Sequence, residues 1–226
     1  MPDGRPRPQV FLASRNAKKL AEMQRLLAEH LPDIEVLGLD DVTSYDEPVE
    51  DAPDFAGNAL LKARAGLAVT GIPSLADDSG LCVAALNGMP GVLSARWSGG
   101  LSGKAKDDDA NNALVLAQLG DVPDGRRGAQ FRCAVAFCYP DSSGVAEEVM
   151  HGAMPGRVIR ECRGAGGFGY DVLFVPDEQD GELTSAELSA EQKDAISHRG
   201  KALREIAPLV VEVLTGAGGG IRTPTP

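Results

Sequence analysis

"PQVFLASRNAKKLAEMQRLLA", residues 8–28, is the stretch that decides the fold. Its start, "PQVFLAS", is a short apolar and partly β-branched run, which predicts a strand over 8–14. Ser14 and Asn16 are residue types that cap the start of a helix. The apolar side chains that follow recur at helical spacing, at Leu20, Met23 and Leu27. The order strand, loop, helix indicates an α/β protein.

The rest of the chain continues this alternation of strand and helix patterns. Further helices are predicted from near Asp54 to about residue 70, over 107–123 and over 197–214. Further strands are predicted at "PSLA" (73–76), which ends at two aspartates, at "FRCAVAFCY" (131–139) and at "YDVLFVP" (170–176). We therefore expect an α/β fold in one domain over 8–215, with flexible tails at 1–7 and 216–226. Its site should lie where strand ends and helix starts converge.

Composition limits the classes of function. The chain has 226 residues, 43% of them hydrophobic, and a net charge of -11, which opposes binding to a nucleic acid but allows one small anion in a locally basic pocket. No stretch approaches the roughly 20 apolar residues of a membrane span, and the start has no signal-peptide core, so we expect a cytoplasmic protein without a membrane partner. The spacing of the cysteines predicts buried free thiols rather than zinc ligands or disulfides, at Cys82, Cys133, Cys138 and Cys162.

Three polar stretches in the first half could hold a phosphate or a metal. In "ASRNAKK" (13–19), backbone N–H groups and side chains at the helix start can surround a phosphate, although an ordinary cap with two solvated lysines is the commoner explanation of such a pattern. In "ADDSG" (76–80), the adjacent Asp77 and Asp78 end an apolar strand, which indicates either a turn or a site for a hard cation. "DEPVED" (46–51) is either a solvated acidic loop or a source of a further ligand.

Two stretches in the last third suggest recognition of a base. "GGFGYD" (166–171) places Phe168 and Tyr170 among glycines, where an exposed ring could stack on a base or could instead fill the core. "KDAISHRGKAL" (193–203) gathers four basic side chains at a helix start, which suit an anion or a carbonyl oxygen unless they are simply solvated.

Taken together, these motifs resemble the inosine triphosphate pyrophosphatase family, from about Val10 to Val213. The resemblance is carried, in order, by "LASRNAKKLAEM", "FAGNALLKA", "ADDSGLCVAALNGMPGVLSARWSG", "GGFGYDVLFVP" and "KDAISHRGKAL". The chain departs from the family pattern at Ser14, where threonine is usual, at Arg15, where a small residue is common, and at Gly57, where an acid usually stands.

The resemblance implies a mixed α/β fold with a long central sheet, two lobes around an active-site cleft, and a homodimer. It implies hydrolysis of ITP, dITP and XTP to the nucleoside monophosphate and pyrophosphate, a house-cleaning activity on the nucleotide pool. A Maf-like pyrophosphatase with another base preference and a nucleotide-binding module without turnover are the alternatives.

The resemblance also assigns the site residues. Those implied to bind phosphate are Ser14, Arg15, Asn16, Ala17, Lys18, Lys19 and Ser79. Those implied to hold Mg²⁺ are Glu50, Asp77 and Asp78, of which we expect Asp78 to orient or deprotonate the attacking water. Those implied to hold the base and ribose are Phe168, Gly169, Tyr170, Asp171, Lys193, His198 and Arg199. A donor such as Arg199 would match the 6-oxo group of inosine or xanthine and would oppose the 6-amino group of adenine.

Overall fold

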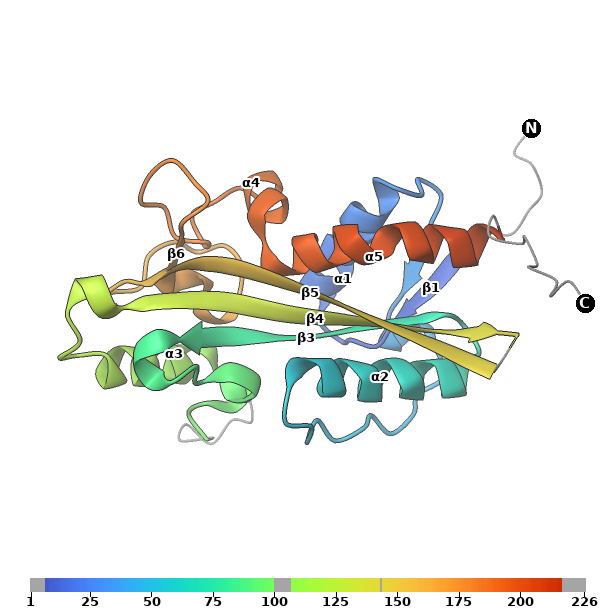
Figure 1. Ribbon diagram of the computed structural model, residues 1–226, viewed down its shortest axis with the longest axis horizontal. Coiled ribbons are helices and arrows are strands. Elements are labelled where there is room, and N and C mark those ends of the chain that lie inside the picture. Colours follow the sequence, from blue (N-terminus) through green and yellow to red (C-terminus); the bar gives the residue numbers. More distant parts are fainter. Residues whose placement is uncertain (1–6, 100–106, 143, 217–226) are drawn as a thin grey trace, which may run out of the picture.

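The central feature of the computed structural model, which describes residues 7–99, 107–142 and 144–216, is one twisted mixed sheet (Figure 1). Its strands lie across the sheet in the order β2-β1-β3-β4-β5-β6. β1 runs parallel to β2 and β3, and the later neighbours run antiparallel. The strands are β1 (Gln9–Leu12), β2 (Glu35–Leu37), β3 (Ser74–Val83), β4 (Gly128–Asp141), β5 (Gly144–Val158) and β6 (Phe174–Pro176).

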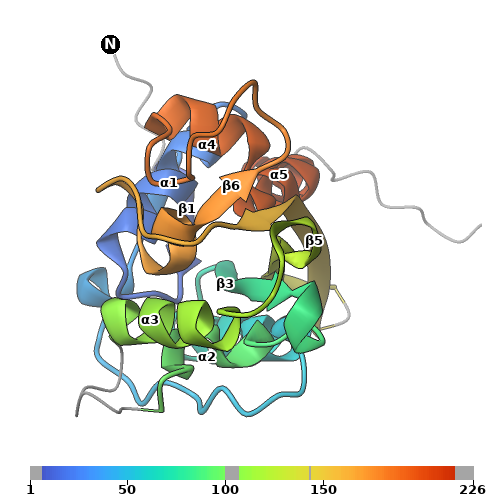
Figure 2. The same ribbon diagram turned by 90° about the vertical axis from the view of Figure 1, so that its left-hand side faces the viewer.

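Helices cover both faces of this sheet. α1 and α5 lie on one side of the long strands, and α2 and α3 lie on the other (Figures 1 and 2). The α-helices are α1 (Ala17–Ala28), α2 (Phe55–Thr70), α3 (Asp108–Gln118), α4 (Ala190–Ile196) and α5 (His198–Thr215). The 3-10 turns are η1 (Leu39–Asp41), η2 (Ala84–Leu86), η3 (Gly91–Arg96), η4 (Asp124–Arg126) and η5 (Gly169–Leu173). The mixed α/β fold that the resemblance implies is confirmed.

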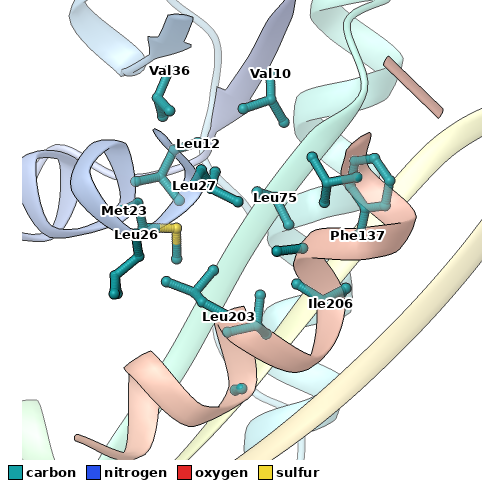
Figure 3. Packing of buried hydrophobic residues seen from close by; sticks show 14 of the residues in the cluster. Val10, Leu12, Met23, Leu26, Leu27, Val36, Leu75, Phe137, Leu203 and Ile206 are labelled. Carbon is teal, nitrogen blue, oxygen red and sulfur yellow. The ribbon is translucent and has the colours of Figure 1, made fainter. Parts of the chain in front are cut away.

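The core between the sheet and the α1–α5 layer follows from the periodicity of the sequence. Leu12 and Leu75 point from the strands toward Met23 of α1 and toward Leu203 and Ile206 of α5 (Figure 3). All five side chains are buried. Each such burial contributes about 1.5–3 kcal/mol to folding, so this face fixes both helices against the sheet.

The core on the other face packs α2 against the same strands. Its small side chains, Ala59 and Ala63, contact Phe11 and Ala76 of the strands. Gly66 lets the helix approach closely, because a Cβ atom there would lie 2.7 Å from the Phe11 ring. α2 is therefore held near the middle of the sheet, beside β3 and β4.

β3 continues through the two aspartates, so the expected strand end at this point is wrong. Asp77 pairs with Val135 of β4, and Asp78 pairs with Ala134. Because successive side chains of a strand point to opposite faces, Asp77 faces the α1–α5 layer and Asp78 faces α2. Two acids that are adjacent in the sequence therefore belong to different surroundings.

Most other predicted elements are confirmed, with two differences in their bounds. The helix predicted over 107–123 ends at Gln118, ahead of Gly120 and Pro123. The strand predicted over 170–176 starts only at Phe174, because Gly169 has a φ of 61° and Asp171 caps a 3-10 turn. β2, β5 and α4 were not predicted. The sequence of β5 has no long apolar run, because charged residues and glycines interrupt its apolar residues.

Several expectations concern single features. The cysteines are free thiols, as expected, but Cys162 is exposed whereas Cys133 and Cys138 are buried. The tails predicted at 1–7 and 216–226 lie, apart from Arg7 and Gly216, outside the described residues. Within the part of the chain that the structure describes, no helix is both long and apolar enough to cross a membrane.

Candidate active site

One cavity brings together motifs that lie far apart in the sequence. β3 forms its base, and α1, α2, α3, α5 and the turns η3 and η5 contribute side chains around it. The predicted site residues that line it are Lys19, Glu50, Asp78, Ser79, Phe168, Gly169, Tyr170, Asp171, Lys193, His198 and Arg199. Asp77 and the segment 14–18 do not line it, and each is described below.

Asp77 is neutralised on the α1–α5 side of the sheet. Lys19 Nζ lies 2.9 Å from Asp77 Oδ2, and Arg199 donates to the same oxygen from Nε and Nη2, each at 3.1 Å. Arg199 Nη1 also donates to the buried Glu22 at 2.6 Å. Burial alone would raise the pKa of Asp77, but the positive charges of Lys19, Arg199 and Lys62 outweigh it and hold this pKa well below its usual range. Asp77 is thus a permanently charged anchor for two cations.

Asp78 has a different environment on the α2 side. Asn58 Nδ2 donates to Asp78 Oδ2 at 2.9 Å, and Lys62 Nζ lies 3.0 Å from Glu50 Oε1. Asp78 takes part in none of the ion pairs between described residues. Burial raises the pKa of Asp78 and Glu50 adds to the rise, while Lys62 and the bond from Asn58 oppose it. Its carboxylate is therefore more basic than that of Asp77.

Glu50 and Asp78 are the carboxylates best placed to hold a metal. Both line the cavity, and the negative charge of Glu50 contributes to the raised pKa of Asp78, a repulsion that a cation would relieve. Mg²⁺ is commonly held by one or two carboxylates, with water and phosphate oxygens completing the octahedron. Among the described residues, no group of three or more acidic, histidine or cysteine side chains is arranged for a metal. The structure does not bring Asp77 into this pair, since its oxygens accept from Lys19 and Arg199.

Phe168 is one of the aromatic side chains that line the cavity. Lys193 Nζ lies 5.4 Å and Arg199 Cζ 5.8 Å from the centre of its ring. Asp171 fixes the turn around it, because one carboxylate oxygen accepts from Phe168 N at 2.8 Å and from Lys193 Nζ at 2.6 Å. A ring between two cations can stack on a base, and the cations can donate to its carbonyl oxygens.

His198 is a neutral member of the cavity. Its ring stacks on Phe131, with centroids 5.0 Å apart. Burial, together with the charges of Arg199 and Lys193, lowers the pKa of His198 well below its usual value. Its backbone lies directly on β5, where a Cβ atom at Gly152 would be only 1.9 Å from His198 O. At neutral pH this imidazole is uncharged.

The segment predicted to bind phosphate is organised around Asn16. Asn16 Oδ1 accepts from the backbone N of Lys18 and of Lys19, at 3.0 and 3.3 Å, and Ser14 Oγ accepts from Asn16 N. The predicted helix cap is confirmed at Asn16, and Ala17 is the first residue of the helix. These bonds set the position of Lys19, the member of the segment that lines the cavity.

Arg15 and Lys18 point to other partners. Arg15 Nε lies 2.7 Å from Glu47 Oε1, with both side chains exposed. Lys18 Nζ donates to Gly167 O at 2.6 Å, which links α1 to the loop that carries Phe168. Neither side chain is directed at the two carboxylates that could hold a metal.

Comparison with known proteins agrees with this geometry. A model of the Ham1 family matches residues 10–209. This chain belongs to the Ham1 family. It is 56% identical over 201 residues to a dITP/XTP pyrophosphatase of Nocardia farcinica, covering 88% of this chain and 93% of the relative. It is 52% identical over 208 residues to a dITP/XTP pyrophosphatase of Corynebacterium glutamicum, covering 91% and 98%.

Solved structures of Ham1 proteins share the fold. The crystal structure of a nucleoside-triphosphatase, or dITP/XTP pyrophosphatase, of Mycobacterium abscessus has a TM-score of 0.68 and 50% identity, and the match covers 88% of this chain and 99% of that one. A HAM1 protein of Coxiella burnetii has a TM-score of 0.77 and 39% identity, covering 90% and 98%. The resemblance to the inosine triphosphate pyrophosphatase family is thereby confirmed.

Sequence reasoning missed some side chains of this Ham1 site. Asn58 is fully buried, yet it lies one helical turn before Lys62 in α2, and both contact the aspartate strand. This spacing of two polar residues on one helix face was the available signal. Glu22 and Asp108 gave no comparable signal, because each makes its contact with a residue far away in the chain.

Proposed function

We propose that this Ham1 protein hydrolyses the α–β phosphoanhydride of ITP, dITP and XTP, and releases the nucleoside monophosphate and pyrophosphate. Relatives that are 52% and 56% identical over most of the chain are dITP/XTP pyrophosphatases by name. The observation that carries the proposal is the position of Asp78, a carboxylate with a raised pKa in the same cavity as Lys19 and Phe168. The activity would remove unusual purine nucleotides from the nucleotide pool.

Glu50 and Asp78 would hold a divalent cation, for which we propose Mg²⁺. When bound, Mg²⁺ neutralises phosphate oxygens and so favours cleavage of the anhydride. Asp78 has the second role of orienting the attacking water and accepting its proton, because its carboxylate is the more basic of the two aspartates and lines the cavity. Lys19 lies in the same cavity and would offset charge on the triphosphate, which lets an acidic protein bind an acidic substrate.

The base would lie against Phe168. Arg199 and Lys193 flank this ring and can donate hydrogen bonds to the 6-oxo group of hypoxanthine or xanthine. The 6-amino group of adenine would place a donor against these donors, at a cost of about 1–3 kcal/mol for each unpaired group. Asp171 holds Lys193 in place through its 2.6 Å ion pair, which makes the arrangement rigid.

The assembly and location of the protein are part of the proposal. Kinship with the inosine triphosphate pyrophosphatases supports a homodimer in the cytoplasm. The net charge of -11 supports a small-molecule substrate rather than a nucleic acid.

A substrate panel tests the proposed function. Pyrophosphate release by the purified protein with Mg²⁺ is measured for ITP, dITP, XTP, GTP and ATP. We expect kcat/KM for ITP, dITP and XTP to exceed the values for ATP and GTP by at least about a hundredfold, the effect of two mismatched hydrogen bonds. ATP is opposed at the 6-position, whereas GTP keeps the 6-oxo group and must be rejected at its 2-amino group, by pocket shape or by the lack of an acceptor. Equal efficiency on ATP would contradict the base selectivity. Saturable ITP binding without pyrophosphate release would indicate a nucleotide-binding module instead.

A further inference from the structure

Both backbone polar groups of Gly169 are held by α3. Gly169 N donates to Asp108 Oδ2 at 2.8 Å, and Asn112 Nδ2 donates to Gly169 O at 3.0 Å. Asp108 and Asn112 are one helical turn apart and so lie on the same face of α3. The two side chains together clamp the peptide groups of one residue.

Gly169 is a residue whose position needs such a clamp. Its φ is 61°, and a Cβ atom there would meet nothing within 4 Å, so no side-chain packing fixes this point of the chain. Phe168 precedes it directly, so the two bonds from α3 hold the peptide groups next to that ring. The position of the ring in the cavity therefore depends on α3.

Asn112 shows that the clamp has an energetic cost. Its side chain is buried, and its Oδ1 atom has no hydrogen-bond partner among the described residues. An unpaired buried acceptor is unfavourable, and a leucine of similar size would avoid it. The amide is useful at this position through its N–H group, which Gly169 O accepts.

We propose that Asp108, together with Asn112, is a positioning residue for base recognition. By fixing Gly169 it sets the place of the Phe168 ring and thereby the discrimination between 6-oxo and 6-amino purines. Asp108 itself lines the cavity, so a change at this residue also alters the part of the cavity where the base would lie. This inference rests on the proposed function, and it assigns to α3 a part in selectivity that acts through the Phe168 turn.

The test compares four variants in the full-length protein. Asp108→Ala removes the acceptor for Gly169 N, Asp108→Asn keeps a carbonyl acceptor, and Asn112→Leu removes the second bond. Asp109→Ala is the matched control, because it removes a carboxylate from the same first turn of α3 at an exposed position. For each, kcat and KM are measured with ITP and ATP, thermal melts record folding, and calorimetry gives Kd for IMP and AMP without turnover.

For Asp108→Ala we expect KM for ITP and Kd for IMP to rise about tenfold, the effect of losing one charged hydrogen bond, with kcat within about threefold. The values for ATP and AMP should change less, so selectivity falls. Asn112→Leu should shift selectivity in the same direction, while Asp108→Asn and Asp109→Ala stay within about threefold of wild type.

Each contrary result has a separate meaning. A folded Asp108→Ala protein that loses ITP and ATP efficiency equally, or loses neither, would overturn the inference. If Asp108→Ala does not fold, Asn112→Leu decides by the same criterion. A wild-type protein that does not prefer ITP would overturn the proposed function instead.

Discussion

Asp77 and Asp78 are the same residue type at adjacent positions, yet the two faces of β3 give them opposite properties. On the α1–α5 face, Lys19 and Arg199 contact Asp77 directly and lower its pKa. On the α2 face, Asp78 accepts a hydrogen bond from a neutral amide, and its pKa is raised. From this comparison we expect charge balance to separate the roles: the balanced carboxylate would support the structure, and the unbalanced one would be available for chemistry.

The largest expected effect is a loss of catalysis when Asp78 is replaced. This loss would distinguish the Asp78 face of β3 from the Asp77 face. Asp78→Asn keeps the shape of the side chain but removes its charge and basicity. We expect kcat for ITP to fall by roughly 10²–10⁴, as for a missing general base, without restoration by extra Mg²⁺. The measurement is Mg²⁺-dependent pyrophosphate release, with a thermal melt to confirm folding. A folded variant that keeps more than about a tenth of wild-type kcat is outside this range and refutes the role of Asp78.

The same substitution one residue earlier should act on stability. Asp77→Asn leaves Lys19 and Arg199 without their shared carboxylate in a buried site, so we expect the free energy of unfolding to fall by about 3–5 kcal/mol. Urea denaturation at neutral pH measures this change. Asp78→Asn is the matched control on the same strand, and it should be far less destabilising. Equal losses in the two variants would show that the faces of β3 do not differ as described.

The smallest expected effect is a pH dependence of the unfolding free energy, which arises from His198 beside the cations on the Asp77 face. His198 precedes Arg199, and its pKa in the folded protein is lowered by burial and by Arg199 and Lys193. In the unfolded chain it protonates near pH 6.5, so its contribution to stability is complete above that pH and is lost as pH falls toward the lower folded pKa. We expect a slope of up to about 1.4 kcal/mol per pH unit in that range.

Substitution identifies the source of this slope. His198→Gln should flatten the dependence of unfolding free energy on pH between about 5 and 6.5, where an unfolded histidine titrates. His151→Gln, at an exposed position of β5, should leave it unchanged. An unaltered slope in His198→Gln would mean that burial and the neighbouring cations do not keep this imidazole neutral.

The elements that the sequence predicted well are those whose cause is local. The apolar run of β1, the Asn16 cap and the spacing of α1 lie within one segment, and all three are present. The buried run of β4 was equally clear. β5 was missed because charged residues and glycines interrupt its apolar residues, so it shows no long apolar run, and its strand form depends on pairing with β4.

The site was predictable as a set of motifs but not as an arrangement. The resemblance named most of the residues that line the cavity. It could not show that Asp77 is neutralised, since its partners Lys19 and Arg199 lie 58 and 122 residues away in the chain. For the same reason the strand was expected to stop at the aspartates, because an unpaired buried acid would have been too costly in a strand interior.

The contact between Gly152 and His198 O has a consequence for how the protein tolerates sequence change. No side chain separates β5 from the first turn of α5 there, so any larger residue must displace the backbone that carries His198 and Arg199. A strand outside the cavity thus contains a position as intolerant of substitution as the cavity itself. We therefore expect substitutions to be tolerated at the solvent-facing positions of β5 but not at Gly152, although this glycine carries no functional group.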